Sequence, residues 1–245
     1  MMTTRYIDLI HQTFDFPAHD FEVKNGELYQ HGIRMMDLVE EFGTPFRAAY
    51  LPQIAHQINK ARDIFNKAIQ QYEYDGQYVY CYCTKSSHFS FVMKEVLKAG
   101  AQLETSSAYD IDLIKNLHAK GYLDESLKIV CNGFKPKGYL QNISDLHDAG
   151  FTNVIAVLDD VKEIDFYTHQ GQSPLQLGIR IAAEEEPNFE FYTSRLGIRY
   201  QDIIKLYEQK IKNNKRFELK MLHFFINTGI KDSAYYWSEL HKALR

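Results

Sequence analysis

Cysteine is scarce in this 245-residue chain, and long apolar runs are missing. Its three cysteines are an odd number, so we expect reduced, buried thiols and no disulfide framework. No apolar stretch approaches the roughly 20 residues that a membrane-spanning helix needs, and the amino-terminal segment lacks the uninterrupted apolar core of a secretory signal. We therefore expect a cytoplasmic protein without a membrane partner.

An excess of basic residues is also missing. The 28 lysines and arginines are outnumbered by 32 aspartates and glutamates, which gives a net charge of −4, and no basic block interrupts the chain. Nucleic acids and anionic membranes are therefore not expected partners, and a small molecule is the expected ligand. The content of hydrophobic residues, 45%, excludes a disordered chain and fits a globular core.

Metal-binding patterns are weak. Cys81 and Cys83 are two residues apart in a strand-like stretch, so both side chains point to the same face. Cys131 is remote in sequence, and no nearby histidine completes a set of ligands. We expect no metal site.

The first forty residues have no steady hydrophobic periodicity. Within them, the stretch 19–32 predicts a short two-stranded element that turns at Asn25-Gly26. The stretch 35–43 predicts a short helix that ends at Gly43, and 52–72 predicts an amphipathic helix. We expect residues 1–40 to be an N-terminal extension and residues 41–245 to form the main domain.

A regular alternation of apolar strands and amphipathic helices follows. Strands are predicted at 77–85, 101–106, 126–133, 152–160, 175–185 and 219–229. Helices are predicted at 89–100, 108–121, 139–150, 200–214 and 233–244, with a shorter one after the fourth strand. This alternation indicates a parallel sheet covered by helices.

Two α/β folds fit such a pattern, a βα barrel and an open doubly wound sheet. Six similar repeats without a Gly-rich dinucleotide turn favour the barrel. The sequence stops after the sixth unit, so we expect an incomplete (βα)8 TIM-barrel-type fold whose outer strands have open edges.

In a parallel βα barrel the ligand lies at the carboxyl ends of the strands. The residues at those ends are unusually polar: Lys85, Glu104, Asn132, Gly133, Asp159, Asp160, Arg180, Asn227, Thr228 and Gly229. A cation, carboxylates and small hydrogen-bonding groups are thus expected at one mouth.

Each of these residues also has an ordinary structural explanation. An ammonium group at the end of a buried strand is partly desolvated, which lowers its pKa and makes Lys85 a candidate nucleophile. A lysine that extends from the rim into water explains the same position equally well. Arg180 can pair with Glu184 or Glu186, and the aspartates at 159–160 can cap a loop or helix.

Several segments together resemble one known family. They are HGIRMMDLVEEFGTPFRAAYLPQIAHQI, YCYCTKSSH, GAQLETSSAYDIDLI, IVCNGFKPKGYL and YTSRLGI. Their combination is similar to the pyridoxal-phosphate decarboxylases of the alanine-racemase-like barrel, also called fold type III, and within them to the biosynthetic arginine decarboxylases. The resemblance covers the chain from about His31 onward.

The resemblance implies a cofactor, pyridoxal 5'-phosphate, and a reaction, the decarboxylation of arginine to agmatine in polyamine biosynthesis. It places Lys85 as the lysine that binds the cofactor covalently and Glu104 as a second catalytic group, with Asp110 as the next acid of that motif. Arg180 matches an arginine near the phenolic oxygen of the cofactor.

The sixth strand departs from the family pattern His-x-His-x-Gly-Ser. His223 matches the first histidine, but Phe225 stands where the second histidine would stack on the pyridine ring. Asn227 replaces the glycine, and Thr228 matches the serine that contacts the phosphate. Arg195 replaces a lysine of the family's Ser-Lys-Phe-Gly motif.

Other family features lie beyond the end of this sequence. They include the Gly-rich phosphate loop, the acidic partner of the pyridine nitrogen and the C-terminal β-domain, so we expect a truncated chain whose own activity stays open. Two alternatives remain, a single-domain pyridoxal-phosphate-binding barrel and a non-catalytic fragment that associates with a full-length subunit. The resemblance implies a homo-oligomer for the full-length form, and the substrate stays open among arginine, ornithine, lysine and diaminopimelate.

Overall fold

The computed structural model describes residues 4–5, 20–169, 174–182 and 196–225, together with residues 237 and 241. Contacts divide the chain into two compact units, Met1–Tyr50 and Leu51–Arg245. The boundary along the chain falls between Tyr50 and Leu51, and the expected division after residue 40 stays a prediction.

The first unit contains a small antiparallel sheet and one helix. The sheet has the order β1 (Thr4–Arg5), β2 (Phe21–Lys24), β3 (Glu27–Gln30) and β4 (Ile33–Arg34), and helix α1 spans Met35–Phe42. Asn25 and Gly26 have φ angles of 54° and 79°, as a two-residue hairpin turn with a type I′ backbone requires. The predicted two-stranded element and the helix ending at Gly43 are confirmed.

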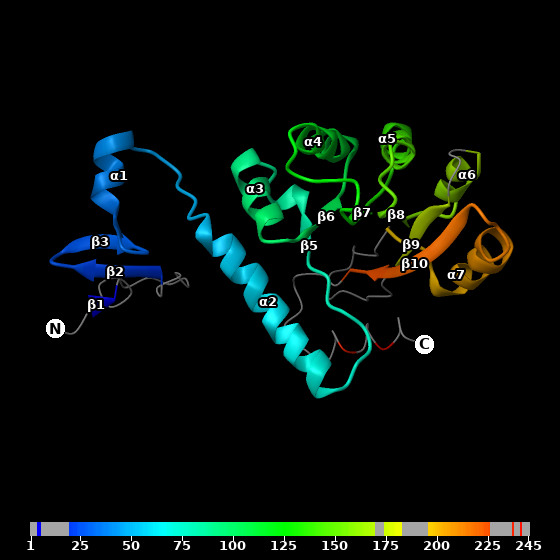
Figure 1. Cartoon of the computed structure of the whole chain (residues 1–245), viewed down its shortest axis with the longest axis horizontal. Helices are drawn as coiled ribbons and strands as arrows, with labels where there is room; N and C mark the ends of the chain where they lie inside the picture. The colour runs from blue at the N-terminus through cyan, green and yellow to red at the C-terminus, as the bar shows by residue number, and fades with distance from the viewer. Residues whose placement is uncertain are drawn as a thin grey trace, which may run out of the picture. The chain divides into compact units, whose positions relative to one another are not determined.

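The second unit is built around a six-stranded parallel sheet (Figure 1). Its strands are β5 (Cys81–Cys83), β6 (Gln102–Thr105), β7 (Ile129–Cys131), β8 (Val154–Leu158), β9 (Leu175–Ile181) and β10 (Phe217–Phe224). Each strand pairs in parallel with its neighbour in the chain, so the order is β10-β9-β8-β7-β6-β5. This confirms the prediction of a partial βα barrel.

One helix precedes the first strand of this sheet, and a helix or helical turn follows each of the strands β5 to β9. They are α2 (Pro52–Gln71), the 3-10 turn η3 (Thr84–Ser86), α3 (Ser90–Lys98), α4 (Ala108–Ala119), α5 (Lys137–Asp148), α6 (Glu163–Thr168), α7 (Tyr200–Leu206) and the π-helical turn η4 (Tyr207–Ile211). Figure 1 shows α3, α4, α5 and α6 in succession along the sheet. The helix predicted at 233–244 lies outside the described residues except at residues 237 and 241.

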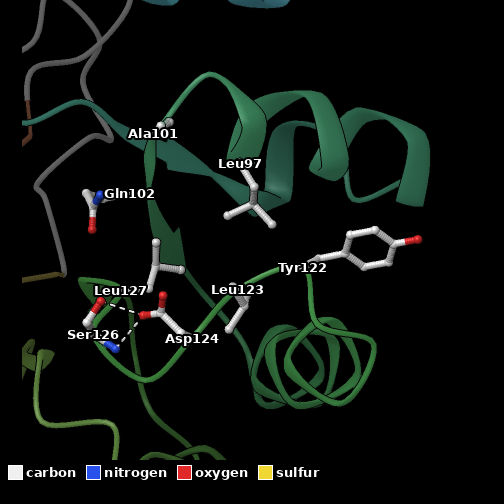
Figure 2. Close-up of a pocket in the computed structure, with 9 residues that line it drawn as sticks. Leu97, Ala101, Gln102, Tyr122, Leu123, Asp124, Ser126 and Leu127 are labelled. Atoms are coloured by element: carbon white, nitrogen blue, oxygen red, sulfur yellow. Dashed lines mark hydrogen bonds between the residues drawn. The ribbon is translucent and has the colours of Figure 1, made fainter.

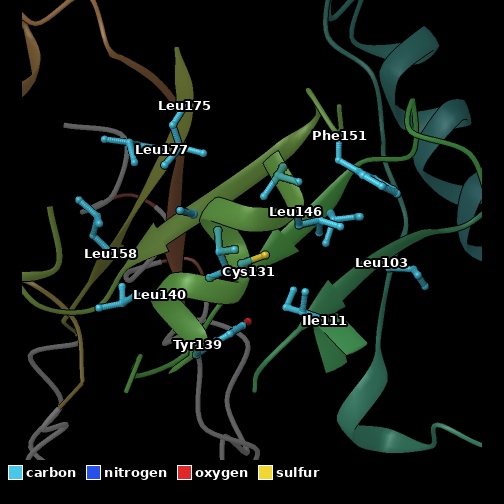
Figure 3. Close-up of a cluster of buried hydrophobic side chains, with 14 of the residues drawn as sticks. Leu103, Ile111, Cys131, Tyr139, Leu140, Leu146, Phe151, Leu158, Leu175 and Leu177 are labelled. Carbon is cyan, nitrogen blue, oxygen red and sulfur yellow. The ribbon is translucent and has the colours of Figure 1, made fainter. Parts of the chain in front are cut away.

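The two faces of the parallel sheet bury different apolar clusters. The face toward the helices carries the main core, to which Leu103, Cys131 and Leu177 contribute from strands and Ile111 and Tyr139 from helices (Figure 3). The opposite face, which we call the inner face, carries a smaller cluster of Val130, Ile155 and Val157 with Cys81 and Met221. Because successive side chains of a strand point to opposite faces, the sequence of each regular strand shows which residues share a face.

A β-bulge decides which residues of β10 reach the inner face. Leu219 pairs with Leu177 in register, but Met221 pairs with Gly178, so the register shifts between Leu219 and Met221. Leu219 accordingly packs in the main core and Met221 in the inner cluster. Such bulges re-aim the side chains that follow them.

The three cysteines differ in burial. Cys131 is buried, whereas Cys81 and Cys83 are half-buried, so the prediction of buried thiols is correct only for Cys131. Of the helices in the described part of the chain, none combines the length and the apolar character that crossing a membrane requires.

Candidate active site

Polar residues extend the inner face at the carboxyl ends of five strands. Glu104, Arg180 and His223 are the last residues but one of β6, β9 and β10. Asn132 and Asp159 directly follow β7 and β8. Asn132 and Asp159 lie two residues beyond Val130 and Val157 of the inner cluster, which places them on the same face. Arg180 and His223 are register partners in neighbouring strands.

The Asn132 side chain connects two of these strand ends. Its amide nitrogen Nδ2 lies 3.1 Å from Oε1 of Glu104 and 3.2 Å from Nε2 of His223. Glu104, Asn132 and His223 therefore form one hydrogen-bonded group, although His223 is 91 residues away from Asn132 in the chain.

Burial controls the protonation of His223. Desolvation lowers the pKa of the imidazole to about 4, and the positive charges of Arg180, Lys135 and Lys85 act in the same direction. His223 is therefore neutral near pH 7. Its Nδ1 atom is buried and has no hydrogen-bond partner among the described residues.

A buried ion pair lies beside this group. Arg180 donates from Nη1 to Oδ1 of Asp159 at 3.4 Å, and the guanidinium carbon of Arg180 lies 5.7 Å from the centre of the Phe225 ring. Oδ2 of Asp159 is buried and, within the described part of the chain, has no partner. The alternative partners Glu184 and Glu186 lie outside the described residues.

The neighbouring Asp160 has the structural role that the sequence allowed for both aspartates. Its Oδ1 accepts a hydrogen bond from the backbone nitrogen of Lys162 at 2.7 Å, in the turn that leads into α6. Asp159 does not cap this turn through its side chain but pairs with Arg180. The two adjacent carboxylates thus differ in their contacts: Asp160 caps a turn, and Asp159 belongs to the buried ion pair.

A second buried ion pair, formed by Lys135 and Glu163, holds the segments that follow β7 and β8. The side chain of Lys135 is fully buried, and its ammonium nitrogen donates to the Gly133 carbonyl at 2.8 Å, to Oε2 of Glu163 at 3.1 Å and to the Val157 carbonyl. Glu163 also accepts hydrogen bonds from the backbone nitrogens of Lys135 and Asp159. The loops that carry Asn132 and Asp159 are therefore held by the same pair.

Lys85 lies in the η3 turn directly after β5, and it is exposed. Of the two interpretations that the sequence left open, this exposure agrees with a lysine that extends from the rim into water. Its charge still acts on its neighbours, because it contributes to lowering the pKa of His223. Thr84, next to Lys85, is buried and donates to the Glu104 carbonyl oxygen at 3.1 Å, which ties the turn to β6.

Asp110, the second acid of the β6 segment, stabilises a helix start. Its Oδ2 accepts from the backbone nitrogen of Ser106 at 2.8 Å and from the hydroxyl of Ser107 at 3.1 Å. Ser107 is the N-cap residue of α4 and in turn accepts a hydrogen bond from the Asp110 nitrogen. This reciprocal arrangement resembles a capping box and explains Asp110 without a catalytic role.

Two open pockets lie at the amino ends of the strands, opposite the polar layer. One, of about 240 Å³, is lined by residues of the α3–β6 and α4–β7 connections, including Gly100, Gln102, Asp124 and Ser126 (Figure 2). The other, of about 290 Å³, shares Gly100, Gln102 and Ser126 with it. Their polar groups satisfy one another: Asp124 Oδ1, for example, accepts from the Ser126 nitrogen at 2.8 Å. Neither pocket is part of the candidate site.

Most of the predicted site residues that the structure describes lie in one layer. Glu104 and His223 share the bridging amide, Arg180 lies beside His223 and Phe225, and Lys85 borders the group. The predicted residues Thr228, Asn227 and Arg195 lie outside the described residues.

The bridge by Asn132 and the burial of Lys135 were not predicted, although both residues belong to a motif that the sequence singled out. The position of Asn132, two residues beyond an inner-face valine, was a usable signal for its orientation. Its contact with β10 depends on how far the sheet curls, which no local pattern reveals.

No model of a protein family matches the chain. A biosynthetic arginine decarboxylase from Vibrio vulnificus is 26% identical over 213 residues, which cover 77% of this chain and 33% of that protein. The chain therefore spans about a third of the length of this curated relative.

Solved structures agree on the fold. A diaminopimelate decarboxylase from M. jannaschii, solved with L-lysine, superposes with a TM-score of 0.73 at 19% identity, over 91% of this chain and 51% of that one. The protein SrLDC in complex with PLP gives a TM-score of 0.64 at 16% identity, over 85% and 48% of the two chains. The chain is thus a sequence relative of biosynthetic arginine decarboxylases and has the barrel fold of amino-acid decarboxylase structures.

Proposed function

We propose that this chain carries the cofactor-binding barrel residues of a pyridoxal-phosphate-dependent amino-acid decarboxylase, with arginine as the substrate. The observation that carries the proposal is the polar layer of Glu104, Asn132, Asp159, Arg180 and His223 on the inner face at the carboxyl ends of the strands. Relatives named arginine decarboxylases support the choice of substrate. The PLP complex among the structural neighbours supports the choice of cofactor.

The described residues fit the ring portion of pyridoxal phosphate. The buried Asp159 Oδ2 has no partner within the described part of the chain, and the Arg180 guanidinium lies against an aromatic ring, so this end of the layer has both a free acceptor and a cation. Lys85 offers an exposed primary amine at the rim, the chemical group that an aldehyde requires. The proposed phosphate contact, Thr228, lies outside the described residues.

When bound, the cofactor supplies the electron sink that lets carbon dioxide leave an amino acid. In this proposal Lys85 would hold the aldehyde end of the cofactor through its amine, and Arg180 would stabilise the anionic form of the phenolic oxygen. Asp159 orients Arg180 through the buried ion pair. Phe225 would offer an aromatic face to the ring of the cofactor, and the Glu104 carboxylate would act as a proton acceptor.

The proposal is tested by adding pyridoxal phosphate to the purified chain while visible absorbance is recorded. Carbon dioxide release is then measured with L-arginine, L-ornithine, L-lysine and meso-diaminopimelate. We expect a pH-dependent visible band that Lys85→Ala removes, and the fastest release from arginine. A missing band would contradict the cofactor assignment, and a band without release from any of the four amino acids would contradict the decarboxylase assignment.

A further inference from the structure

The amide of Asn132 lies between a carboxylate and an imidazole. One amide nitrogen, Nδ2, is within hydrogen-bond distance of both Glu104 Oε1, at 3.1 Å, and His223 Nε2, at 3.2 Å. A primary amide has two N–H donors, so Nδ2 can serve both partners at once. The three residues come from β6, from the residue after β7, and from β10.

The carboxylate fixes which way the amide points. An ionised carboxylate only accepts hydrogen bonds, so the Asn132 side chain must present its nitrogen to Glu104. The opposite orientation would place the amide oxygen against a carboxylate oxygen and lose the 3.1 Å contact. The same nitrogen therefore also faces His223.

The fixed amide in turn fixes the imidazole. Because Nδ2 is a donor, His223 Nε2 must accept, and it carries no proton. The proton of a neutral ring then resides on Nδ1. That nitrogen is buried and has no partner among the residues that the structure describes.

We propose that Glu104 and Asn132 are positioning residues that hold His223 as the neutral tautomer with its proton on Nδ1. The inference concerns the resting protein and does not require the cofactor. Only its consequence for the active site rests on the proposed function: His223 then adds a neutral donor, and no fourth cation, beside Arg180, Lys135 and Lys85.

The charges around the ring agree with this arrangement. Arg180 on β9, Lys135 after β7 and Lys85 in η3 all disfavour a second proton on the imidazole, as does burial, and together they lower its pKa to about 4. Glu104 is the acid of the group, but its carboxylate contacts the amide of Asn132, which lies between it and the ring. A carboxylate in direct contact with the imidazole would raise the pKa of His223. The neutral Asn132 amide contacts the imidazole in its place.

The test is a long-range ¹H–¹⁵N correlation spectrum of the full chain without added cofactor, in which a protonated imidazole nitrogen differs from a bare one. The signal of His223 is assigned by its loss in His223→Gln. We expect a bare Nε2 and a protonated Nδ1 near pH 7.5. A proton on Nε2, or on both nitrogens, would overturn the inference with no variant required.

Asn132→Asp gives the reverse arrangement when it is combined with Glu104→Gln, because the new carboxylate then faces no second carboxylate and accepts from the ring. We expect the proton to move to Nε2 and the pKa of His223 to rise from about 4 to about 6.5 or higher. The matched control is Asn142→Asp in the same Glu104→Gln background, because the Asn142 amide donates to the Ala108 carbonyl. A purely structural Asn132 would lower stability without exchanging the tautomer, and that result would contradict the inference.

The two proposals fail separately. Pyridoxal phosphate binding, measured by visible absorbance in the same samples, tests the proposed function. Absent binding with the expected tautomer would overturn the proposed function and support the inference. Intact binding with the proton on Nε2 would do the opposite.

Discussion

Asn132 and His223 contact each other although their strands are not neighbours in the sheet. Strands β8 and β9 lie between β7 and β10, yet Nδ2 of Asn132 is 3.2 Å from Nε2 of His223. Strands three positions apart in a flat sheet would be separated by about 14 Å. The sheet therefore curls so strongly that side chains meet across its inner face, as in a βα barrel.

Close packing against its register partners Val157 on β8 and Met221 on β10 makes Gly178 sensitive to substitution. A Cβ atom at this position would lie 2.9 Å from Val157 Cγ2 and 3.4 Å from Met221 Cβ. We expect Gly178→Ala to lower the free energy of unfolding by about 1–3 kcal/mol, as overpacking in cores does. Chemical denaturation followed by circular dichroism measures this change.

Gly138 in α5 is the matched control for Gly178. A Cβ atom there would meet no other atom within 4 Å. Gly138→Ala should leave stability unchanged or raise it by up to about 1 kcal/mol, because alanine favours a helix. Equal losses at both positions would contradict the account of close packing between Gly178 and its register partners.

The buried pair of Lys135 and Glu163 gives a prediction on stability and its pH dependence. Lys135→Met removes a cation whose side chain is fully buried and leaves Glu163, 6% exposed, without its counter-charge. We expect a loss of about 3–5 kcal/mol at pH 7 from denaturant unfolding. Burial already raises the pKa of Glu163 and Lys135 opposes that rise, so the variant pKa rises further.

The sign of the pH effect follows from that raised pKa. A carboxyl group that binds its proton more tightly in the folded state stabilises the protein at low pH, and this stabilisation is lost as the pH rises through the folded-state pKa. The loss caused by Lys135→Met should therefore be smaller at pH 5 than at pH 7. Adding Glu163→Gln should recover part of it at pH 7, and a double variant no more stable than the single one would refute the explanation.

His223 gives the opposite pH dependence. Its pKa is about 4 in the folded protein and near its ordinary 6.5 in the unfolded chain. As the pH falls from about 6.5 to 4, the unfolded state takes up a proton that the folded state does not, so stability falls by up to about 3 kcal/mol. The free energy of unfolding, measured at several pH values across this window, should depend less steeply on pH in His223→Gln than in the unaltered chain. An equal pH dependence in both would count against a buried, neutral His223.

Much of the fold was predictable because local patterns determine it. The turn at Asn25-Gly26, the helix ending at Gly43 and the six strands all correspond to turn chemistry or hydrophobic periodicity. Strand lengths were less predictable, since the strand expected at 77–85 pairs only over Cys81–Cys83. As an edge strand it has one neighbour in the described sheet, which limits where the ladder extends.

The site was predictable residue by residue but not as a network. Strand-end position identified Glu104, Asn132 and Arg180, and the family resemblance identified His223. The bulge between Leu219 and Met221 reverses which side chains of β10 point to the inner face. Simple alternation counted from Leu219 would therefore place His223 on the opposite face. Sheet curvature and bulges arise from packing over the whole sheet, so no single segment encodes the contact between Asn132 and His223.

The central claim, that the amine of Lys85 receives pyridoxal phosphate, is tested most directly by peptide mapping. The chain is mixed with the cofactor, reduced with borohydride and digested, and mass spectrometry then locates the attached pyridoxyl group. We predict attachment at Lys85, its loss in Lys85→Ala, and no change in Lys98→Ala, whose side chain is 70% exposed on α3. Attachment at another lysine of the unaltered chain, or undiminished attachment in Lys85→Ala, would contradict the account.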